Sequence, residues 1–168
     1  MEIERKFLIK EREKKYPSPF NVEELKKNIK KYGRNLTQYY LPLDLLKIVS
    51  DEFDFKLKFK PNEFRIRKLG NKYSRCVRSK GKIKRSEFER SITREEFKTL
   101  KEFKEKTIKK IRLMKKMQDK TWFVDYFPKQ SLITIEVEFE NEAEAKNFKT
   151  NMREITGKKE YSNRNLAE

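Results

Sequence analysis

Hydrophobic and charged residues alternate with a period of two along much of this chain, which is the spacing of a β-strand with one buried face. The alternation is clear in Glu2-Ile3-Glu4-Arg5-Lys6-Phe7 and in Phe64-Arg65-Ile66-Arg67. Similar alternation, or enrichment in Phe, Ile, Val and Tyr, predicts strands over 2–9, 36–41, 53–59, 63–69, 73–79, 86–92, 108–114, 121–127 and 131–139. Short strands in this number favour a mostly antiparallel sheet or barrel.

Three other segments carry the start signals of helices. Asn21 begins a predicted helix that runs through Lys31, and Thr93 begins a second; each is followed three residues later by a glutamate, as in a capping box. Asn141 begins a third predicted helix, which carries an apolar stripe and is closed by Gly157. The fold class expected from these patterns is α+β and mostly β.

Charge is abundant and unevenly distributed. Charged residues make up 42% of the 168 positions, and 44 Lys and Arg against 27 Asp and Glu give a formal net charge of +17. Residues 60–85 hold eleven basic residues and one acidic residue, whereas residues 130–145 hold five glutamates and no Lys or Arg. Both blocks alternate with apolar residues, which favours folded strands over charged disordered tails.

The residues that are missing exclude several kinds of chemistry. The chain has no histidine, which removes Ser-His-Asp and Cys-His catalysis and histidine metal ligands. Its single cysteine, Cys76, allows neither an internal disulfide nor a structural zinc site. No apolar run reaches the roughly 18 residues of a membrane span, and no signal-peptide pattern opens the chain, so we expect a cytoplasmic protein with no membrane partner.

Charges of one sign recur on single strand faces, because residues i and i+2 of a strand point the same way. Such pairs are Glu2 and Glu4, Arg65 and Arg67, Glu87 and Glu89, Lys110 and Arg112, and Glu136 and Glu138. A solvated sheet face explains any one pair, but like charges side by side destabilise a sheet. The whole set is explained better if a polyanion and a cation occupy the space between these faces. Arg and Lys bind phosphate oxygens, and Mg²⁺ or Mn²⁺ takes carboxylate oxygens.

The stretch Glu2-Ile3-Glu4-Arg5-Lys6-Phe7 resembles the ExExK signature of the CYTH, or triphosphate tunnel metalloenzyme, superfamily. Further segments that resemble the family follow in its order: Gln38-Tyr39-Tyr40-Leu41, Phe64-Arg65-Ile66-Arg67, Arg85-Ser86-Glu87-Phe88-Glu89, Lys110-Ile111-Arg112, Thr121-Trp122-Phe123-Val124-Asp125, Glu136-Val137-Glu138 and Tyr161-Ser162-Asn163-Arg164-Asn165-Leu166-Ala167. The resemblance spans nearly the whole chain, and it is strongest to the small bacterial tripolyphosphatases. It implies that residues 1–168 form a single CYTH-like domain, an eight-stranded antiparallel closed barrel (a triphosphate tunnel) with a few flanking helices, in which 53–59 is an excursion.

The resemblance also implies roles for individual residues. Lys110 matches the catalytic lysine that orients or deprotonates the attacking water. The implied ligands of Mg²⁺ or Mn²⁺ are Glu2, Glu4, Glu136 and Glu138, with Glu87, Glu89 and Asp125 as further candidates. The implied phosphate-binding residues are Lys6, Arg65, Arg67, Arg78 and Arg112.

Three features depart from the family pattern. Arg78 stands where a lysine is usual, and Phe123 stands where a carboxylate is common. About a dozen residues near Pro42–Phe55 look inserted between the glutamine strand and the double-arginine strand. We expect the insertion to alter one mouth of the tunnel.

The function implied is divalent-metal-dependent hydrolysis of a triphosphate, either inorganic tripolyphosphate or a nucleoside or organic triphosphate. Two alternatives stay open. One is a class IV-type adenylate cyclase on the same scaffold. The other is a non-catalytic basic protein that binds nucleic acid or polyphosphate, which the net charge favours and the paired glutamates disfavour. Hydrolysis of triphosphorylated RNA would use both the basic and the acidic residues.

Overall fold

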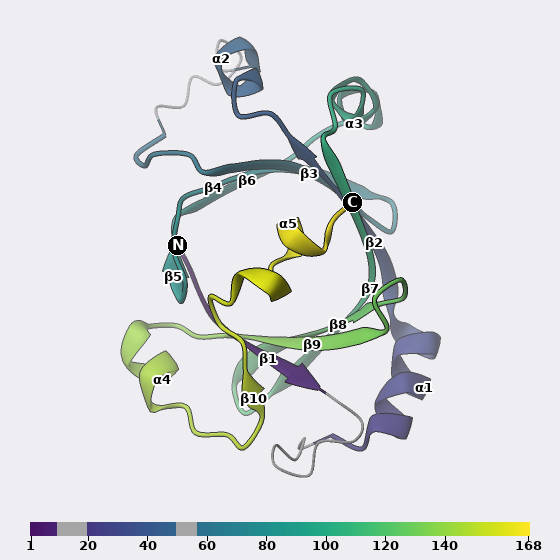
Figure 1. Ribbon diagram of the computed structural model, residues 1–168, viewed down its shortest axis with the longest axis vertical. Helices are drawn as coiled ribbons and strands as arrows, with labels where there is room; N and C mark the ends of the chain where they lie inside the picture. The colour runs from purple at the N-terminus through teal and green to yellow at the C-terminus, as the bar shows by residue number, and fades with distance from the viewer. Residues whose placement is uncertain (10–19, 50–56) are drawn as a thin grey trace.

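The computed structural model describes residues 1–9, 20–49 and 57–168, and its main feature is one large antiparallel sheet (Figure 1). Strands of five residues or more are arranged in the order β1-β9-β8-β7-β2-β3-β4-β6. These are β1 (Glu2–Ile9), β2 (Arg34–Leu41), β3 (Glu63–Leu69), β4 (Lys72–Arg78), β6 (Glu87–Ser91), β7 (Lys106–Met117), β8 (Lys120–Phe127) and β9 (Leu132–Glu138). Each corresponds to a predicted strand. Of the segment 53–59, only 57–59 lie within the described residues, and these are not in a strand.

The sheet is strongly curved but does not close into a continuous ladder. Within the described residues, the last strand, β6, pairs only with β4. The short strand β5 (Lys84–Arg85), which directly precedes β6 in the chain, pairs instead with Glu2 and Ile3 of β1. Ser86 separates β5 from β6, and its N–H donates to the hydroxyl of Ser79. The predicted closed barrel is therefore not confirmed, although eight long antiparallel strands are present.

The helices lie outside the sheet, except at the C-terminus, which lies within its curve (Figure 1). They are α1 (Val22–Tyr32), α2 (Leu45–Val49), α3 (Arg94–Lys101), α4 (Glu142–Asn147) and α5 (Asn163–Leu166), with a 3₁₀ turn over Lys159–Tyr161. The first two predicted caps are confirmed: the Asn21 side chain accepts from the N–H of Glu24, and Thr93 forms a capping box with Glu96. No helix among the described residues is both long and apolar enough to cross a membrane.

The third predicted helix is wrong beyond its first turns, because contacts with β1 end it. Arg5 Nη1 donates to the carbonyl oxygens of Ala145 and Phe148, at 2.9 and 2.6 Å, at the end of α4. The chain then turns back, and β10 (Arg153–Glu154) pairs with Phe7 and Leu8 at the edge of β1. Exposed strand edges favour pairing, so the tertiary contacts override the helical pattern.

The period-two pattern places the hydrophobic core and the charged residues on opposite faces of the sheet. Phe7, Val124 and Ile135 pack beneath α1 and α4 in one buried cluster, and Phe64 packs in another beneath α3. The opposite face carries the buried polar side chains, which include Glu4, Gln38, Arg65, Arg78, Lys110, Asp125, Thr134 and Glu136. The fold therefore turns the charged strand faces inward rather than toward solvent.

Candidate active site

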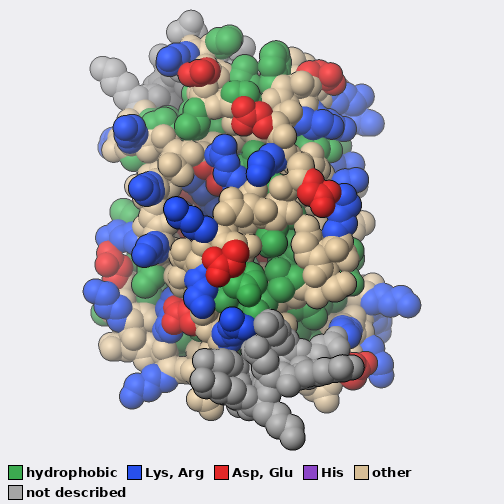
Figure 2. Space-filling view, in the orientation of Figure 1, with side chains coloured by type: hydrophobic (Ala, Val, Ile, Leu, Met, Phe, Trp, Pro, Cys, Tyr) green, Lys and Arg blue, Asp and Glu red, His purple; other side chains and the backbone are tan. Residues whose placement is uncertain are grey.

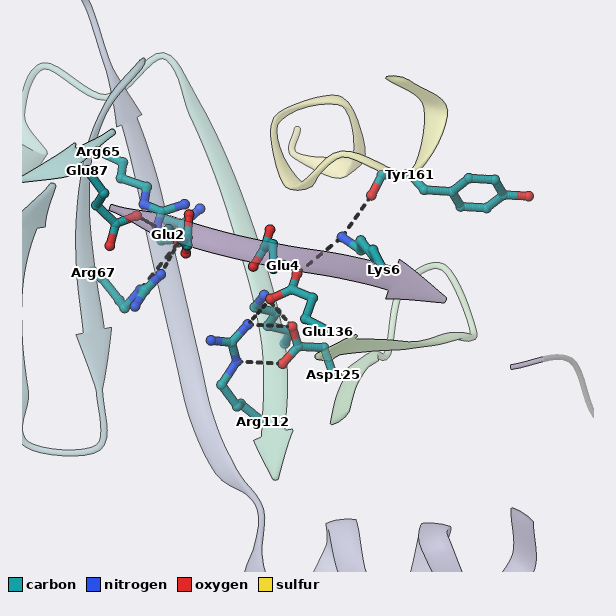
Figure 3. Close-up of polar contacts among 12 residues, drawn as sticks. Glu2, Glu4, Lys6, Arg65, Arg67, Glu87, Arg112, Asp125, Glu136 and Tyr161 are labelled. Carbon is teal, nitrogen blue, oxygen red and sulfur yellow. Dashed lines mark hydrogen bonds and ion pairs between the residues drawn. The ribbon is translucent and has the colours of Figure 1, made fainter. Parts of the chain in front are cut away.

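The inward face of the sheet and the C-terminal segment enclose a cavity of about 600 Å³. Its strand-borne lining consists of Glu4, Lys6, Tyr40, Glu63, Arg65, Arg78, Arg85 and Glu136, with Asn62 just before β3. Residues 80–82 and most of residues 155–165 form the remaining wall. Side chains from strands far apart in the sequence therefore face one space (Figure 3).

Arg65 is a buried cation in the wall of this cavity, with an exposed fraction of 1%. Its Nη1 lies 3.3 Å from Glu63 Oε1, and its Nη2 lies 3.7 Å from Glu87 Oε2. Its Nε and Nη2 have no hydrogen-bond partner in the described structure. Because a buried donor without an acceptor costs about 1–3 kcal/mol, these nitrogens are suited to receiving the oxygens of an anionic ligand.

The two N-terminal glutamates are held by arginines of neighbouring strands. Arg78 Nη2 lies 2.7 Å from Glu2 Oε1, and Arg78 also donates to Glu87. Arg85 Nε lies 2.8 Å from Glu2 Oε2, and its Nη2 contacts Glu4. Arg85 was missed in the sequence, where it is one basic residue among many in the block 60–85.

Carboxylates face one another across β1 and β9. The register sets Glu4 directly opposite Glu138 and Lys6 opposite Glu136. Burial and the charge of Glu136 raise the pKa of Glu4 to about 7. Burial and the charge of Glu2 raise the pKa of Glu138. The folded state therefore disfavours a negative charge on Glu4 and on Glu138, chiefly because both carboxyl groups are buried.

A second pocket, of about 320 Å³, is lined by four glutamates: Glu2, Glu87, Glu89 and Glu138. Carboxylate oxygens are the donors that Mg²⁺ and Mn²⁺ prefer, so the chemistry of this lining fits a hard divalent cation. No three acidic side chains of the described residues are arranged closely enough to hold an ion as they stand. The predicted ligand set is also divided, since Glu4 and Glu136 line the larger cavity instead.

Lys110 lies at the centre of a buried ion cluster and is 2% exposed. Its Nζ is 2.6 Å from Asp125 Oδ2. Arg112 binds the same carboxylate through both oxygens, at 2.7 Å each, and its Nη2 lies 2.9 Å from Glu136 Oε2. Burial and the charge of Arg112 lower the pKa of Lys110 to about 7. The lysine is thus close to the protonation balance that a general base needs near neutral pH.

Glu136 links this buried cluster to the cavity. Its Oε1 lies 3.4 Å from the ammonium group of Lys6, and its other oxygen binds Arg112. Lys6 also donates to the carbonyl oxygen of Tyr161 at 3.0 Å, which ties the C-terminal segment to β1 (Figure 3). Lys110 itself is not among the described residues that line the cavity. The predicted catalytic lysine therefore lies behind the cavity wall and is joined to Glu136 in that wall through Asp125 and Arg112.

Arg67 and the glutamine strand form a polar chain beside Arg65. Arg67 lies 3.7 Å from Glu89, and its Nε is 3.4 Å from Gln38 Oε1. Gln38 Nε2 donates to the hydroxyl oxygen of Tyr40 at 2.6 Å. Burial and the charge of Arg65 lower the pKa of Arg67 to about 10. Of the predicted phosphate-binding residues, Lys6, Arg65 and Arg78 line the larger cavity, whereas Arg67 and Arg112 do not.

Comparison with known proteins gives similar structures but no similar sequences. No family model matches the chain, and no curated protein matches it. The crystal structure of the inorganic triphosphatase NE1496 is 25% identical, with a TM-score of 0.55, over 99% of this chain and 93% of that one. A proposed adenylate cyclase from Bacillus halodurans is 16% identical, with a TM-score of 0.56, over 87% and 84%. The PH1012 protein from Pyrococcus horikoshii OT3 is 21% identical, with a TM-score of 0.53, over 87% and 84%.

Three observations agree: the match to NE1496, the ordered sequence motifs and the charged inner face of the sheet. In fold as well as in its ordered motifs, the chain is similar to the triphosphate tunnel proteins of the CYTH superfamily. The proteins from Bacillus and Pyrococcus, both below 25% identity, support the fold alone.

The chain departs from the pattern of the superfamily that it resembles at two positions, and the structure shows what each residue contacts. Phe123 lies beneath the guanidinium group of Arg112, whose carbon is 4.4 Å from the ring centre, so a cation–π contact stands where a carboxylate is common. Arg78, in place of a lysine, donates through separate nitrogens to Glu2 and Glu87. A lysine has a single nitrogen and could not hold the two carboxylates in this geometry.

Proposed function

We propose that this protein is a divalent-metal-dependent triphosphatase that hydrolyses inorganic tripolyphosphate or a nucleoside or organic triphosphate in the 600 Å³ cavity. The observation that carries the proposal is Arg65, which is buried in the cavity wall with guanidinium nitrogens that lack hydrogen-bond partners. A triphosphate offers many acceptor oxygens and about four negative charges, which suit such donors. The likeness to NE1496, described as an inorganic triphosphatase, supports the same reaction class.

The cations around the cavity suggest how a triphosphate would be bound. Arg65 on β3 and Lys6 on β1 approach the space from different strands. Their charges would neutralise phosphate oxygens, and a triphosphate would compete with Glu136 for Lys6. In the architecture that we propose, β5 and β6 together serve as the last wall of a tunnel, since one residue separates them and they pair with β1 and β4 respectively.

The hydrolysis itself needs a water, a proton acceptor and a leaving phosphate. The water oxygen forms a bond to the terminal phosphorus, the bond from that phosphorus to the bridging oxygen breaks, and the electron pair leaves with the remaining phosphate chain. We assign the water's proton to Lys110 Nζ, which is partly neutral near pH 7 because burial and Arg112 lower its pKa. For this transfer the water must reach Lys110 Nζ directly. The ion pairs that join Lys110 to Glu136 in the cavity wall pass through Arg112, whose guanidinium group stays protonated and cannot relay a proton.

A divalent cation would be held by the carboxylates that line the smaller pocket, Glu2, Glu87, Glu89 and Glu138. Such an ion supplies Lewis-acid stabilisation of the charge that develops on phosphate oxygens. The raised pKa of Glu138, caused by burial and Glu2, is the sign of a carboxylate that gains from a nearby positive charge.

The test is phosphate release from tripolyphosphate, ATP, thiamine triphosphate and 5′-triphosphorylated RNA, each with Mg²⁺, with Mn²⁺ or with EDTA. We expect release from at least one triphosphate with a metal, and none with EDTA. Formation of cyclic AMP from ATP without phosphate release would replace the hydrolase by a cyclase. Absence of turnover with every substrate and both metals would overturn the proposal.

A further inference from the structure

The cavity has two zones that differ in charge balance. In the strand-borne zone, four cations, Lys6, Arg65, Arg78 and Arg85, face three carboxylates of the same lining, those of Glu4, Glu63 and Glu136, so most of the positive charge is balanced. The second zone, which we name the basic rim, consists of Lys80, Lys82, Lys158, Lys159 and Arg164. No Asp or Glu of the described residues lines the cavity in that zone. The basic rim therefore carries positive charge that the protein's own lining does not balance.

The basic rim is one continuous surface, although its residues come from two parts of the chain. Gly157 has a left-handed backbone, with φ of +72°, and the methylene carbons of Lys82 lie against it. A Cβ atom added to Gly157 would stand only 2.9 Å from Cγ and Cδ of Lys82. The loop that carries Lys82 thus packs directly on the segment that carries Lys158 and Lys159. In the view of Figure 2, Lys and Arg side chains outnumber Asp and Glu on the face that includes the C-terminal segment.

The lysines of the basic rim are exposed and available to a ligand. Lys80, Lys82, Lys158 and Lys159 are all exposed, and none forms an ion pair within the described structure. Arg164 is partly buried, and its one ion-pair partner, Glu105, is at 4.0 Å. A compact triphosphate in the strand-borne zone would leave these charges unused, whereas a longer phosphate chain would reach them.

We infer that the basic rim binds the continuing chain of a linear inorganic polyphosphate whose terminal phosphates occupy the cavity. This inference rests on the proposed function of the same cavity and names its substrate class. The reaction is the one proposed above: water adds to the terminal phosphorus, the last anhydride bond breaks, and orthophosphate leaves a chain shorter by one phosphate. The rim would supply affinity for each added phosphate, since Lys and Arg bind phosphate oxygens through charge-assisted hydrogen bonds.

Inorganic polyphosphate fits this surface better than single-stranded RNA does. Proteins that bind single strands usually stack bases on exposed aromatic rings. Tyr161 and Tyr40 are the aromatic residues among the described lining of the cavity. The ring of Tyr161 points away from the charged cluster (Figure 3), and Tyr40 is 1% exposed. The rim thus offers positive charge to a phosphate chain but no exposed aromatic ring on which the bases of RNA could stack.

The inference is tested by equilibrium binding in EDTA, where metal-dependent turnover is excluded. The probes are tripolyphosphate, long-chain polyphosphate and a 5′-triphosphorylated RNA oligonucleotide, compared at equal concentrations of chain ends. We expect long-chain polyphosphate to bind about tenfold or more tightly than tripolyphosphate at low salt, with a steeper salt dependence. The double substitution Lys158→Gln and Lys159→Gln should remove most of that advantage, because it should weaken binding of the long chain at least about fivefold more than binding of tripolyphosphate.

The matched control is Lys30→Gln with Lys31→Gln, an adjacent exposed pair on α1 that removes the same charge away from the cavity. This control should retain the preference for long chains. Equal affinity for long and short chains, equal loss of both in the rim variant, loss in the control variant, or RNA that binds as tightly as polyphosphate would each overturn the inference. Phosphate release from tripolyphosphate with Mn²⁺ decides the proposed function separately, because it needs no contact with the rim.

Discussion

Glu4 provides a direct test of the crowded carboxylates, because its charge is unfavourable in the folded protein. Burial and the charge of Glu136 raise the pKa of Glu4 from an ordinary 4.5 to about 7. The folded state therefore holds a proton on Glu4 over a pH range in which the unfolded chain has lost it. The stability that this proton confers is fully present below about pH 4.5 and is lost as the pH rises through 7.

The expected size of the effect follows from that difference in pKa. One pKa unit corresponds to about 1.4 kcal/mol, so the site costs the wild-type fold up to about 3 kcal/mol between pH 4.5 and pH 8. Glu4→Gln has no proton to lose and escapes this cost. Relative to the wild type, the variant's free energy of unfolding should therefore rise across that pH range by about this amount, even though its contact with Arg85 is weakened at every pH.

The measurement is urea unfolding of both proteins in EDTA at several pH values between 4.5 and 8. Glu140→Gln, at an exposed glutamate just after β9, is the matched control and should follow the wild type at every pH. If the stability difference between Glu4→Gln and the wild type is the same at pH 5 and pH 8, burial and Glu136 do not raise the pKa of Glu4. The account of a buried glutamate whose charge is unfavourable in the folded protein would then fail.

Three further substitutions test the catalytic, phosphate-binding and metal-binding residues. Lys110→Ala should lower kcat by about a hundredfold to ten-thousandfold. It should also abolish the rise in kcat through pH 7, because the neutral amine of the wild type produces that rise. A raised KM at normal kcat would reassign Lys110 to substrate binding. Arg65→Met should weaken tripolyphosphate binding by about tenfold to a hundredfold, as expected for a charge-assisted contact worth about 1.5–3 kcal/mol, and unchanged affinity would place Arg65 outside the site. In EDTA, Glu138→Gln should melt at the wild-type temperature or slightly above it, because burial and Glu2 raise the pKa of Glu138. Mn²⁺ should stabilise the variant less than it stabilises the wild type. Equal stabilisation would exclude Glu138 as a metal ligand.

Most strands could be predicted from the sequence because alternation is a local property that each segment carries by itself. The capped starts at Asn21 and Thr93 are local in the same way. The helix expected after Asn141 starts where predicted, with Asn141 as its cap, but it ends early because what ends it is not local. Arg5, far away in sequence, takes the last carbonyl groups of α4, and the edge of β1 takes the residues that follow.

The candidate site was predictable as a set of inward charges but not as a set of contacts. Residues i and i+2 of a strand lie on the same face, so Glu2 and Glu4 share a face, as do Lys110 and Arg112, whichever strands pair with theirs. Contacts depend on register, which alternation alone does not fix. Because Arg112 lies directly across from Asp125, its guanidinium group is occupied by that carboxylate instead of facing the cavity. Closure of the sheet likewise depends on pairing between β1 and β6, which no pattern within either strand determines.

The central claim is that the interior cavity binds a triphosphate through buried cations of the sheet. The most direct measurement is calorimetric titration of tripolyphosphate into the wild type, Arg65→Met and Arg94→Met, the last being an exposed arginine at the start of α3. We predict one triphosphate bound per chain in the wild type and in Arg94→Met, with a dissociation constant about tenfold or more higher in Arg65→Met. No saturable binding by the wild type, or equal affinity in all three proteins, would contradict the claim.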